Sequence, residues 1–211
     1  MPAGAAPTSA GALAGAFGGV RGTVEASVPP VAFVVAYTIS GQDTTVSAIA
    51  ALVVGILLTV ARLARRETVQ HAITGLVGVA LAAFVATKTG KAENFFLPGL
   101  LANAAYAAIY FVSIVVRWPL IGVIVSGLSG TGSVWRRDPA LMRAYTRASW
   151  LWVVLFLTRL LVQLPLYLAG SVTELGIART AMGLPLFGLG VWLTWLLIRE
   201  RPAGDARPAN L

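Results

Sequence analysis

Arg159 is the residue whose type and position most clearly indicate chemistry. It lies near the middle of the apolar run LWVVLFLTRLLVQLPLYLAG, residues 151–170. An arginine at the centre of a bilayer costs about 2.5–3.5 kcal/mol on insertion scales, so its side chain is expected to face the bundle interior or water. Gln163 lies four residues later, on the same helical face. Two interpretations stay open: a site that attracts an anion or orients a substrate, and a structural arginine bonded to carbonyls or to a carboxylate.

Asn103 and Glu25 are the other polar residues expected in or beside the membrane. Asn103 shares a helical face with Gly99 and Ala107, which favours close helix packing with the amide as an interhelical hydrogen-bond partner. Glu25 could pair with a basic residue or transfer a proton, but we favour a solvated carboxylate near a helix N-terminus. The candidate polar site within the membrane therefore comprises Arg159, Gln163, Asn103 and Glu25.

Arg159 is expected to bond to an oxygen atom close to it. The expected partners are Asn103, ordered water and the carbonyls freed by Pro29, Pro30 or Pro165, together with Glu25 if the first helix bends inward.

Two further groups of charged residues lie outside the apolar segments. The loop at 88–94 carries Lys88, Lys91 and Glu93; it is either a charged mouth to an inner cavity or a solvated turn with Phe95 and Phe96 at the membrane interface. We favour the turn. A cytoplasmic basic face comprises Arg136, Arg137, Arg143 and Arg147. For this face we favour contact with anionic lipid headgroups over a specific binding role.

The composition of the chain sets its class. Of the 211 residues, 57% are hydrophobic and 11% charged, and the mean hydropathy is +0.81. A soluble domain carries about 25% charged residues, so the chain is expected to be an integral membrane protein. The net charge of +8 fits basic cytoplasmic loops and does not require a nucleic-acid partner. Cysteine is absent and His71 is the single histidine. No metal site, cofactor or catalytic constellation is therefore expected, and a lipid-modifying enzyme is the least favoured function.

The apolar segments predict an all-α transmembrane bundle. They lie at about 27–40, 44–61, 72–87, 95–116, 118–130, 149–170 and 177–198. A spanning helix needs about 20 residues, so 118–130 is expected to be a re-entrant or half-length helix beside about six spans. A single domain at 21–199 lies between disordered tails at 1–20 and 200–211.

Arginine placement predicts the orientation in the inner membrane. Arg62, Arg65 and Arg66 follow the second span and are expected in the cytoplasm. Both termini are then cytoplasmic. The basic face also lies inside if 118–130 enters the membrane and returns.

Several long strings resemble a known family: AFVVAYT, ATKTGKAENFFLPGLLANAAY, RWPLIG, WRRDP and GLPLFGLGVWLTWL, with the run around Arg159. They are similar to the actinobacterial family called domain of unknown function 3159, over roughly residues 21–198. The resemblance implies a polytopic inner-membrane protein and no particular activity. More remotely, the layout is similar to the intracellular septation protein A family. Those proteins carry an acid among the polar residues of the span matching about 156–163, where this chain has Arg159 and Gln163.

Two functions follow as hypotheses. The favoured one is a small transporter-like or channel-like bundle with a polar site around Arg159, which predicts a water-accessible cavity reaching the middle of the membrane. The alternative is a non-enzymatic scaffold for cell-envelope or division proteins, which predicts a dry, packed core around Arg159. A membrane-protein partner or a second copy of the chain would then bind the cytoplasmic arginine loops.

Overall fold

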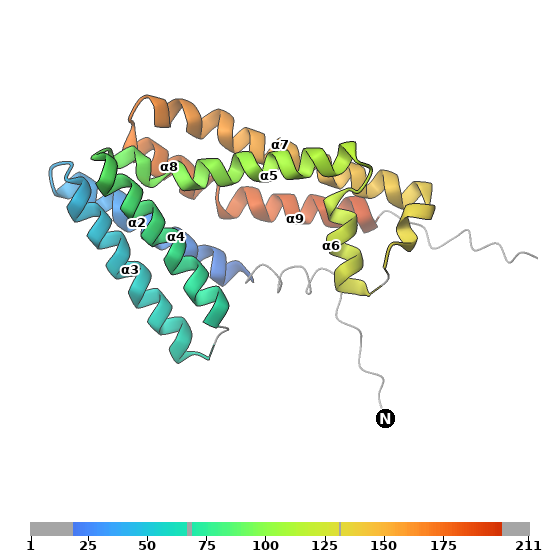
Figure 1. Ribbon diagram of the computed structural model, residues 1–211, viewed down its shortest axis with the longest axis horizontal. Helices are drawn as coiled ribbons and strands as arrows, with labels where there is room; N and C mark the ends of the chain where they lie inside the picture. The colour runs from blue at the N-terminus through green and yellow to red at the C-terminus, as the bar shows by residue number, and fades with distance from the viewer. Residues whose placement is uncertain (1–18, 67–68, 131, 200–211) are drawn as a thin grey trace, which may run out of the picture.

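The structure is a computed structural model that describes residues 19–66, 69–130 and 132–199 (Figure 1). The described residues are helical, with no strand among them. The α-helices are α2 (Gly19–Ile39), α3 (Thr44–Ala64), α4 (Val69–Thr89), α5 (Leu97–Val115), α6 (Leu120–Ser129), α7 (Pro139–Leu168), α8 (Val172–Ala181) and α9 (Leu184–Arg199). Two 3-10 turns, η1 (Ala92–Phe95) and η2 (Val134–Arg137), precede α5 and α7. Tails are predicted at 1–20 and 200–211; residues 1–18 and 200–211 lie outside the described residues, whereas Gly19 and Val20 belong to α2 and not to a disordered tail.

Aspartates mark the starts of two of the longest helices. Asp43 accepts hydrogen bonds from the backbone amides of Thr45 and Val46 at 2.7 and 3.0 Å, and so caps α3. Asp138 caps α7 in the same way, and Pro139 occupies the first helical position. Each cap satisfies amides that have no partner within the helix.

The helices form two groups. One contains α2, α3 and α4, the other contains α5, α7 and α9, and α8 contacts α2 as well as α7. In Figure 1 the α2–α3, α4–α5 and α7–α8 turns lie at the same end of the molecule. Away from that end the groups diverge, so that the α3–α4 turn lies apart from α6.

Aromatic side chains fill the end where the groups meet. Phe33 of α2 stacks on Phe95 with ring centroids 4.0 Å apart, and Phe96 packs edge-on against both. All three rings are buried. The expectation that Phe95 and Phe96 lie at the membrane interface is therefore wrong, because both rings belong to the core that joins α2 to η1.

Segment 118–130 forms α6, a helix of 10 residues. The helices on either side of it, α5 and α7, pack against each other, and the end of α5 and the start of α7 lie at one end of the molecule (Figure 1). A methyl group at Gly122 would lie only 2.9 Å from the Tyr145 ring of α7, so glycine permits this close packing. The chain therefore returns after α6 to the end at which α5 finished.

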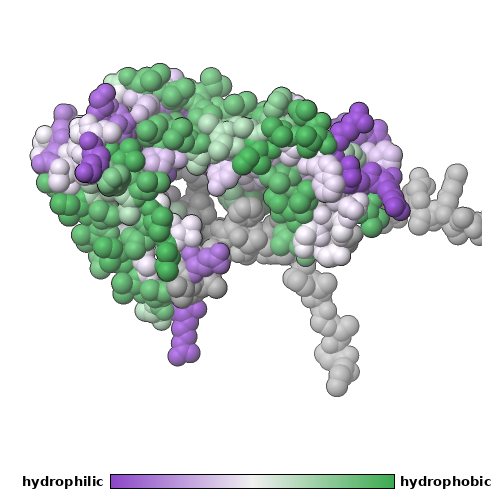
Figure 2. Space-filling view, viewed as in Figure 1, coloured by the Kyte–Doolittle hydropathy of each residue, from purple (hydrophilic) through white to green (hydrophobic). Residues whose placement is uncertain are grey.

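Four stretches are long and apolar enough to cross a membrane: Thr44–Ala64, Leu97–Val115, Pro139–Leu168 and Val172–Ile198. Shorter apolar helices cover Val24–Ile39, Ile73–Thr89 and Leu120–Ser129. The face in Figure 2 is apolar along the helices and hydrophilic at the ends of the molecule. Long apolar helices with apolar outer surfaces are what a lipid-embedded protein requires.

The last predicted span differs from the structure. The sequence predicts one segment at 177–198, whereas the chain forms α8, a break at Met182 and Gly183, and then α9. Pro185 has no amide hydrogen and cannot bond to the carbonyl four residues earlier, so the helix is interrupted at this point. Arg179 lies in the last turn of α8, just before the break.

Candidate functional site

A cavity of about 200 Å³ lies where the two helical groups meet. Its lining residues come from α2, α5, α7 and α8 and from the break that follows α8: Ala26, Ser27, Pro30, Asn103, Arg159, Gln163, Arg179, Thr180 and Gly183. Three of the four residues grouped from the sequence, Arg159, Gln163 and Asn103, thus line one cavity. Glu25 does not.

Arg159 holds the C-terminal end of α8. Its Nη2 donates to the carbonyl of Met182 at 2.6 Å and to that of Gly183 at 2.9 Å. The Met182 carbonyl lies at the C-terminal end of α8, where carbonyls carry partial negative charge, so the guanidinium stabilises it. The Gly183 carbonyl also accepts from the Phe187 amide of α9, at 3.2 Å. These partners replace the expected ones, Asn103 and the carbonyls freed by Pro29, Pro30 or Pro165. The reason is the α8–α9 break, which exposes carbonyls closer to Arg159.

Arg159 is only partly satisfied by these bonds. Its Nε is buried and has no hydrogen-bond partner in the described parts of the chain. A buried donor without an acceptor costs about 1–3 kcal/mol. Arg159 is therefore held through Nη2 alone, and its Nε is an unpaired donor inside the protein.

Arg179 is the site residue that sequence reasoning missed. Its guanidinium lies directly against Gly99 of α5, where an added methyl group would overlap it. The guanidinium carbon also lies 5.8 Å from the centre of the Phe96 ring. Within 19–66, 69–130 and 132–199, no hydrogen bond or carboxylate partner satisfies Arg179. Gly183 and Pro185 were the available signal, because they indicate a helix break just after Arg179, but they do not indicate the contact with Gly99.

Gln163 and Asn103 differ in their hydrogen bonds. Gln163 is 2% exposed and makes no hydrogen bond to any described residue, although it lines the cavity. Asn103 donates from Nδ2 to the carbonyl of Gly99, at 2.9 Å, within its own helix. The interhelical bond expected from Asn103 is therefore replaced by one inside α5.

The charged side chains that line the cavity are all positive. Arg159 and Arg179 contribute two guanidiniums, and none of its described lining residues is acidic. Charges within a membrane protein are poorly screened, because the surrounding dielectric constant is low. This arrangement attracts anions and repels cations.

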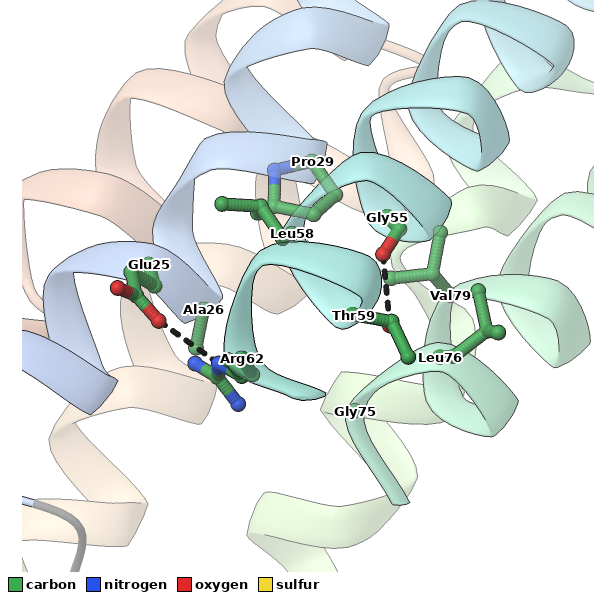
Figure 3. Close-up of a pocket in the computed structure, with 10 residues that line it drawn as sticks. All are labelled: Glu25, Ala26, Pro29, Gly55, Leu58, Thr59, Arg62, Gly75, Leu76 and Val79. Carbon is green, nitrogen blue, oxygen red and sulfur yellow. Dashed lines mark hydrogen bonds and ion pairs between the residues drawn. The ribbon is translucent and has the colours of Figure 1, made fainter. Parts of the chain in front are cut away.

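Glu25 belongs to a second, smaller pocket of about 90 Å³ between α2, α3 and α4 (Figure 3). Nε of Arg62 donates to the Glu25 carboxylate at 2.7 Å, and Nη1 of Arg65 does so at 3.1 Å. The Glu25 side chain is 13% exposed. The favoured interpretation of Glu25 as a solvated carboxylate is therefore wrong, since this residue ties α2 to α3 through an ion pair.

The loop residues lie away from both pockets. Lys88 and Lys91 are exposed and Glu93 is half-buried in η1. Asn94 accepts from the Tyr167 hydroxyl and donates to Thr89 at 2.9 Å, which ties the loop to α7 and α4. The loop is thus a turn fixed by a polar network, with its two lysines directed to the surface.

The four arginines of the basic face are exposed around η2 and the start of α7. The Arg136 guanidinium lies over the Trp118 ring, 4.2 Å from its centre. Arg143 donates from Nε to the carbonyl of Pro139 at 3.2 Å. Among the residues that the structure describes, no three histidine, aspartate or glutamate side chains gather where they could hold a metal ion.

Comparison with known proteins identifies one family. Residues 17–204 match the family described as "Protein of unknown function (DUF3159)". No curated protein and no solved structure matches the chain.

Proposed function

Because this chain belongs to the DUF3159 family of unknown function, its role must be inferred from its own site, and we propose that it is a transporter-like or channel-like protein that takes a small anion into the arginine-lined cavity. The observation that carries the proposal is the pairing of Arg159 with Arg179 in one cavity whose described lining contains no acid.

The energetic cost of these residues supports a role for them. Each arginine within the hydrocarbon costs about 2.5–3.5 kcal/mol on insertion scales. Arg159 offsets part of its cost with two carbonyl bonds, whereas Arg179 has no polar partner among the described residues. A bound anion would offset the remaining cost for both.

The discontinuous α8–α9 helix supports the same function. Membrane transporters commonly bind substrate beside interrupted helices, where backbone groups and helix ends face the ligand. Here the break is at Met182 and Gly183, Gly183 lines the cavity, and α9 begins at the next residue. The N-terminal end of a helix carries partial positive charge, which favours an anion beside it.

The cavity lies between the two helical groups, with α2 on one side and α5 and α7 on the other. Movement of one group relative to the other would therefore change access to the cavity. The scaffold hypothesis expects a dry, packed core around Arg159. One water needs a cavity of only about 10–15 Å³, so a cavity of about 200 Å³ favours the transporter-like hypothesis.

We also propose an orientation for the chain. The protein lies in the inner membrane with both termini in the cytoplasm, which places Arg62, Arg65 and the basic face on the cytoplasmic side. The exposed arginines of the basic face then contact anionic lipid headgroups.

The experiment is an anion flux assay with purified protein in liposomes. The panel is chloride, nitrate, acetate, phosphate and succinate. At least one of these anions should cross faster than in protein-free liposomes, and Arg179→Gln should remove most of that rate. Arg136→Gln, which neutralises an exposed arginine of the basic face, is the matched control and should retain it. If folded protein leaves all five rates at the protein-free level, the transport proposal fails and the scaffold function is favoured.

A further inference from the structure

The described polar atoms around the cavity offer more unused donors than unused acceptors. Arg179 presents a whole guanidinium, which has five N–H donors, and Gln163 presents an amide with two. The structure gives neither side chain a hydrogen bond to a described residue. By contrast, Thr180 and Asn103 already donate to the carbonyls of Gly176 and Gly99.

Gln163 is the independent sign that a ligand is required. A side chain that is 2% exposed normally finds hydrogen-bond partners, because a buried unsatisfied amide is costly. Gln163 instead faces a cavity large enough for a ligand with several atoms. The Nε of Arg159 also lacks a partner among described atoms, but it is buried and is not a donor for a ligand in the cavity.

We propose, on the basis of the proposed function, that the cavity binds a small oxyanion with two negative charges, such as phosphate or a short dicarboxylate. Arg179 and Gln163 are its direct ligands. Two guanidiniums match two negative charges, and the planar fork of a guanidinium pairs with two oxygens of a carboxylate or phosphate at once. A spherical halide uses this geometry less well and fills little of the cavity.

Gly99 determines where Arg179 can lie. The guanidinium occupies the space beside the α5 backbone that a side chain at position 99 would fill. Gly99→Ala should therefore displace the guanidinium without removing any polar group. Because the overlap is with the end of a flexible side chain, the variant is expected to fold.

The experiment measures thermal stability of the purified full chain in detergent, at constant ionic strength, with phosphate, sulfate, succinate, acetate or chloride. An anion that binds only the folded protein raises its melting temperature. Phosphate, sulfate or succinate should give a saturable rise, and acetate and chloride should give none. The order of the phosphate and succinate affinities identifies phosphoryl or carboxylate chemistry.

Four variants locate the binding site. Arg179→Gln, Gln163→Leu and Gly99→Ala should each weaken binding by about tenfold or more, equivalent to about 1.4 kcal/mol. Arg136→Gln should bind like the unmodified chain. If Arg179→Gln does not fold, Gly99→Ala and Gln163→Leu carry the test, because they leave both charges in place.

The outcomes separate this inference from the proposed function. If chloride or acetate binds as tightly as the divalent anions, the ligand class is overturned while the anion cavity stands. If divalent anions bind equally well to all four variants, the assignment of Arg179 and Gln163 is overturned. If no anion of the binding panel binds and no anion of the flux panel crosses liposomes containing folded protein, both proposals fail.

Discussion

The guanidinium of Arg179 lies in the space that residue 99 leaves empty because it is glycine. This contact joins α8 to α5 and directs a charge toward the space between the helical groups. Arg159, on α7, holds the carbonyls that follow α8. Of the two arginines that line the cavity, one is thus anchored by the protein and the other has no polar anchor among the described residues.

This difference predicts opposite effects of two matched substitutions. Arg159→Leu loses two charge-assisted bonds, worth about 1.5–3 kcal/mol each, but avoids an insertion cost of about 2.5–3.5 kcal/mol, so the mid-values give a net loss of about 1.5 kcal/mol. Arg179→Leu loses no hydrogen bond to a described residue and should melt at the same or a higher temperature. Melting in detergent without anions measures both. A lower melting temperature for Arg179→Leu than for Arg159→Leu would contradict the assignment.

The Glu25–Arg62 pair should stabilise the contact between α2 and α3. In a double-mutant cycle with Glu25→Gln and Arg62→Gln, we expect a coupling free energy of about 1–3 kcal/mol, because the pair is largely buried. The same cycle with Arg65→Gln should give less, since Arg65 is more exposed. Equal coupling in the two cycles would show that burial does not set the strength of these pairs.

Single cysteines can test the orientation without background, because the chain has none. Cysteines at the exposed residues Ser133 and Thr45 should be labelled from opposite sides of the membrane, Ser133 from the cytoplasm and Thr45 from outside. A membrane-impermeant thiol reagent on intact and on permeabilised cells makes the measurement. Labelling of Ser133 from outside would mean that α6 crosses the membrane.

The basic face should bind anionic lipid in a salt-dependent way. Each arginine near the membrane surface contributes about 1 kcal/mol, and salt weakens this attraction. Joint replacement of Arg136, Arg143 and Arg147 by Gln should reduce retention of a fluorescent phosphatidylglycerol analogue. Retention of a phosphatidylcholine analogue is the control. If the two lipids are retained equally by the unmodified chain, the face has no preference for anionic headgroups.

The lysines of the loop at 88–94 should be dispensable. Lys88 and Lys91 are exposed and lie outside both pockets. Replacing both by Gln should change the melting temperature and anion flux little, since exposed charges contribute little to stability. Loss of flux in this double variant at unchanged stability would instead favour a charged mouth that draws anions inward.

The length and position of the apolar segments were sufficient to place most of the helices. The runs at 44–61 and 72–87 lie within α3 and α4, and the short segment 118–130 contains a short helix. The inward placement of Arg159 also followed from the sequence, because a charge facing lipid is costly. These features depend on local composition and on the membrane as solvent.

The missed features depend on contacts between distant segments. Nothing near Arg179 in sequence indicates that Gly99 leaves room for it, and nothing near Glu25 points to Arg62. The α8–α9 break was also missed, because Gly183 and Pro185 lie in an otherwise apolar run whose mean hydropathy stays high. Without that break, the carbonyls that hold Arg159 were not expected.

One turn of α2 serves both pockets. Glu25 and Pro29 face the ion-pair pocket, Ser27 and Pro30 face the arginine cavity, and Ala26 lines both. A rotation of α2 about its axis that improved one set of contacts would withdraw residues from the other, so the two pockets share a single rotational setting of this helix. Prolines at 29 and 30 also leave the carbonyls of residues 25 and 26 without their helical donors. The turn of α2 that lines both pockets therefore lacks two of the backbone hydrogen bonds that would otherwise resist a twist of the helix.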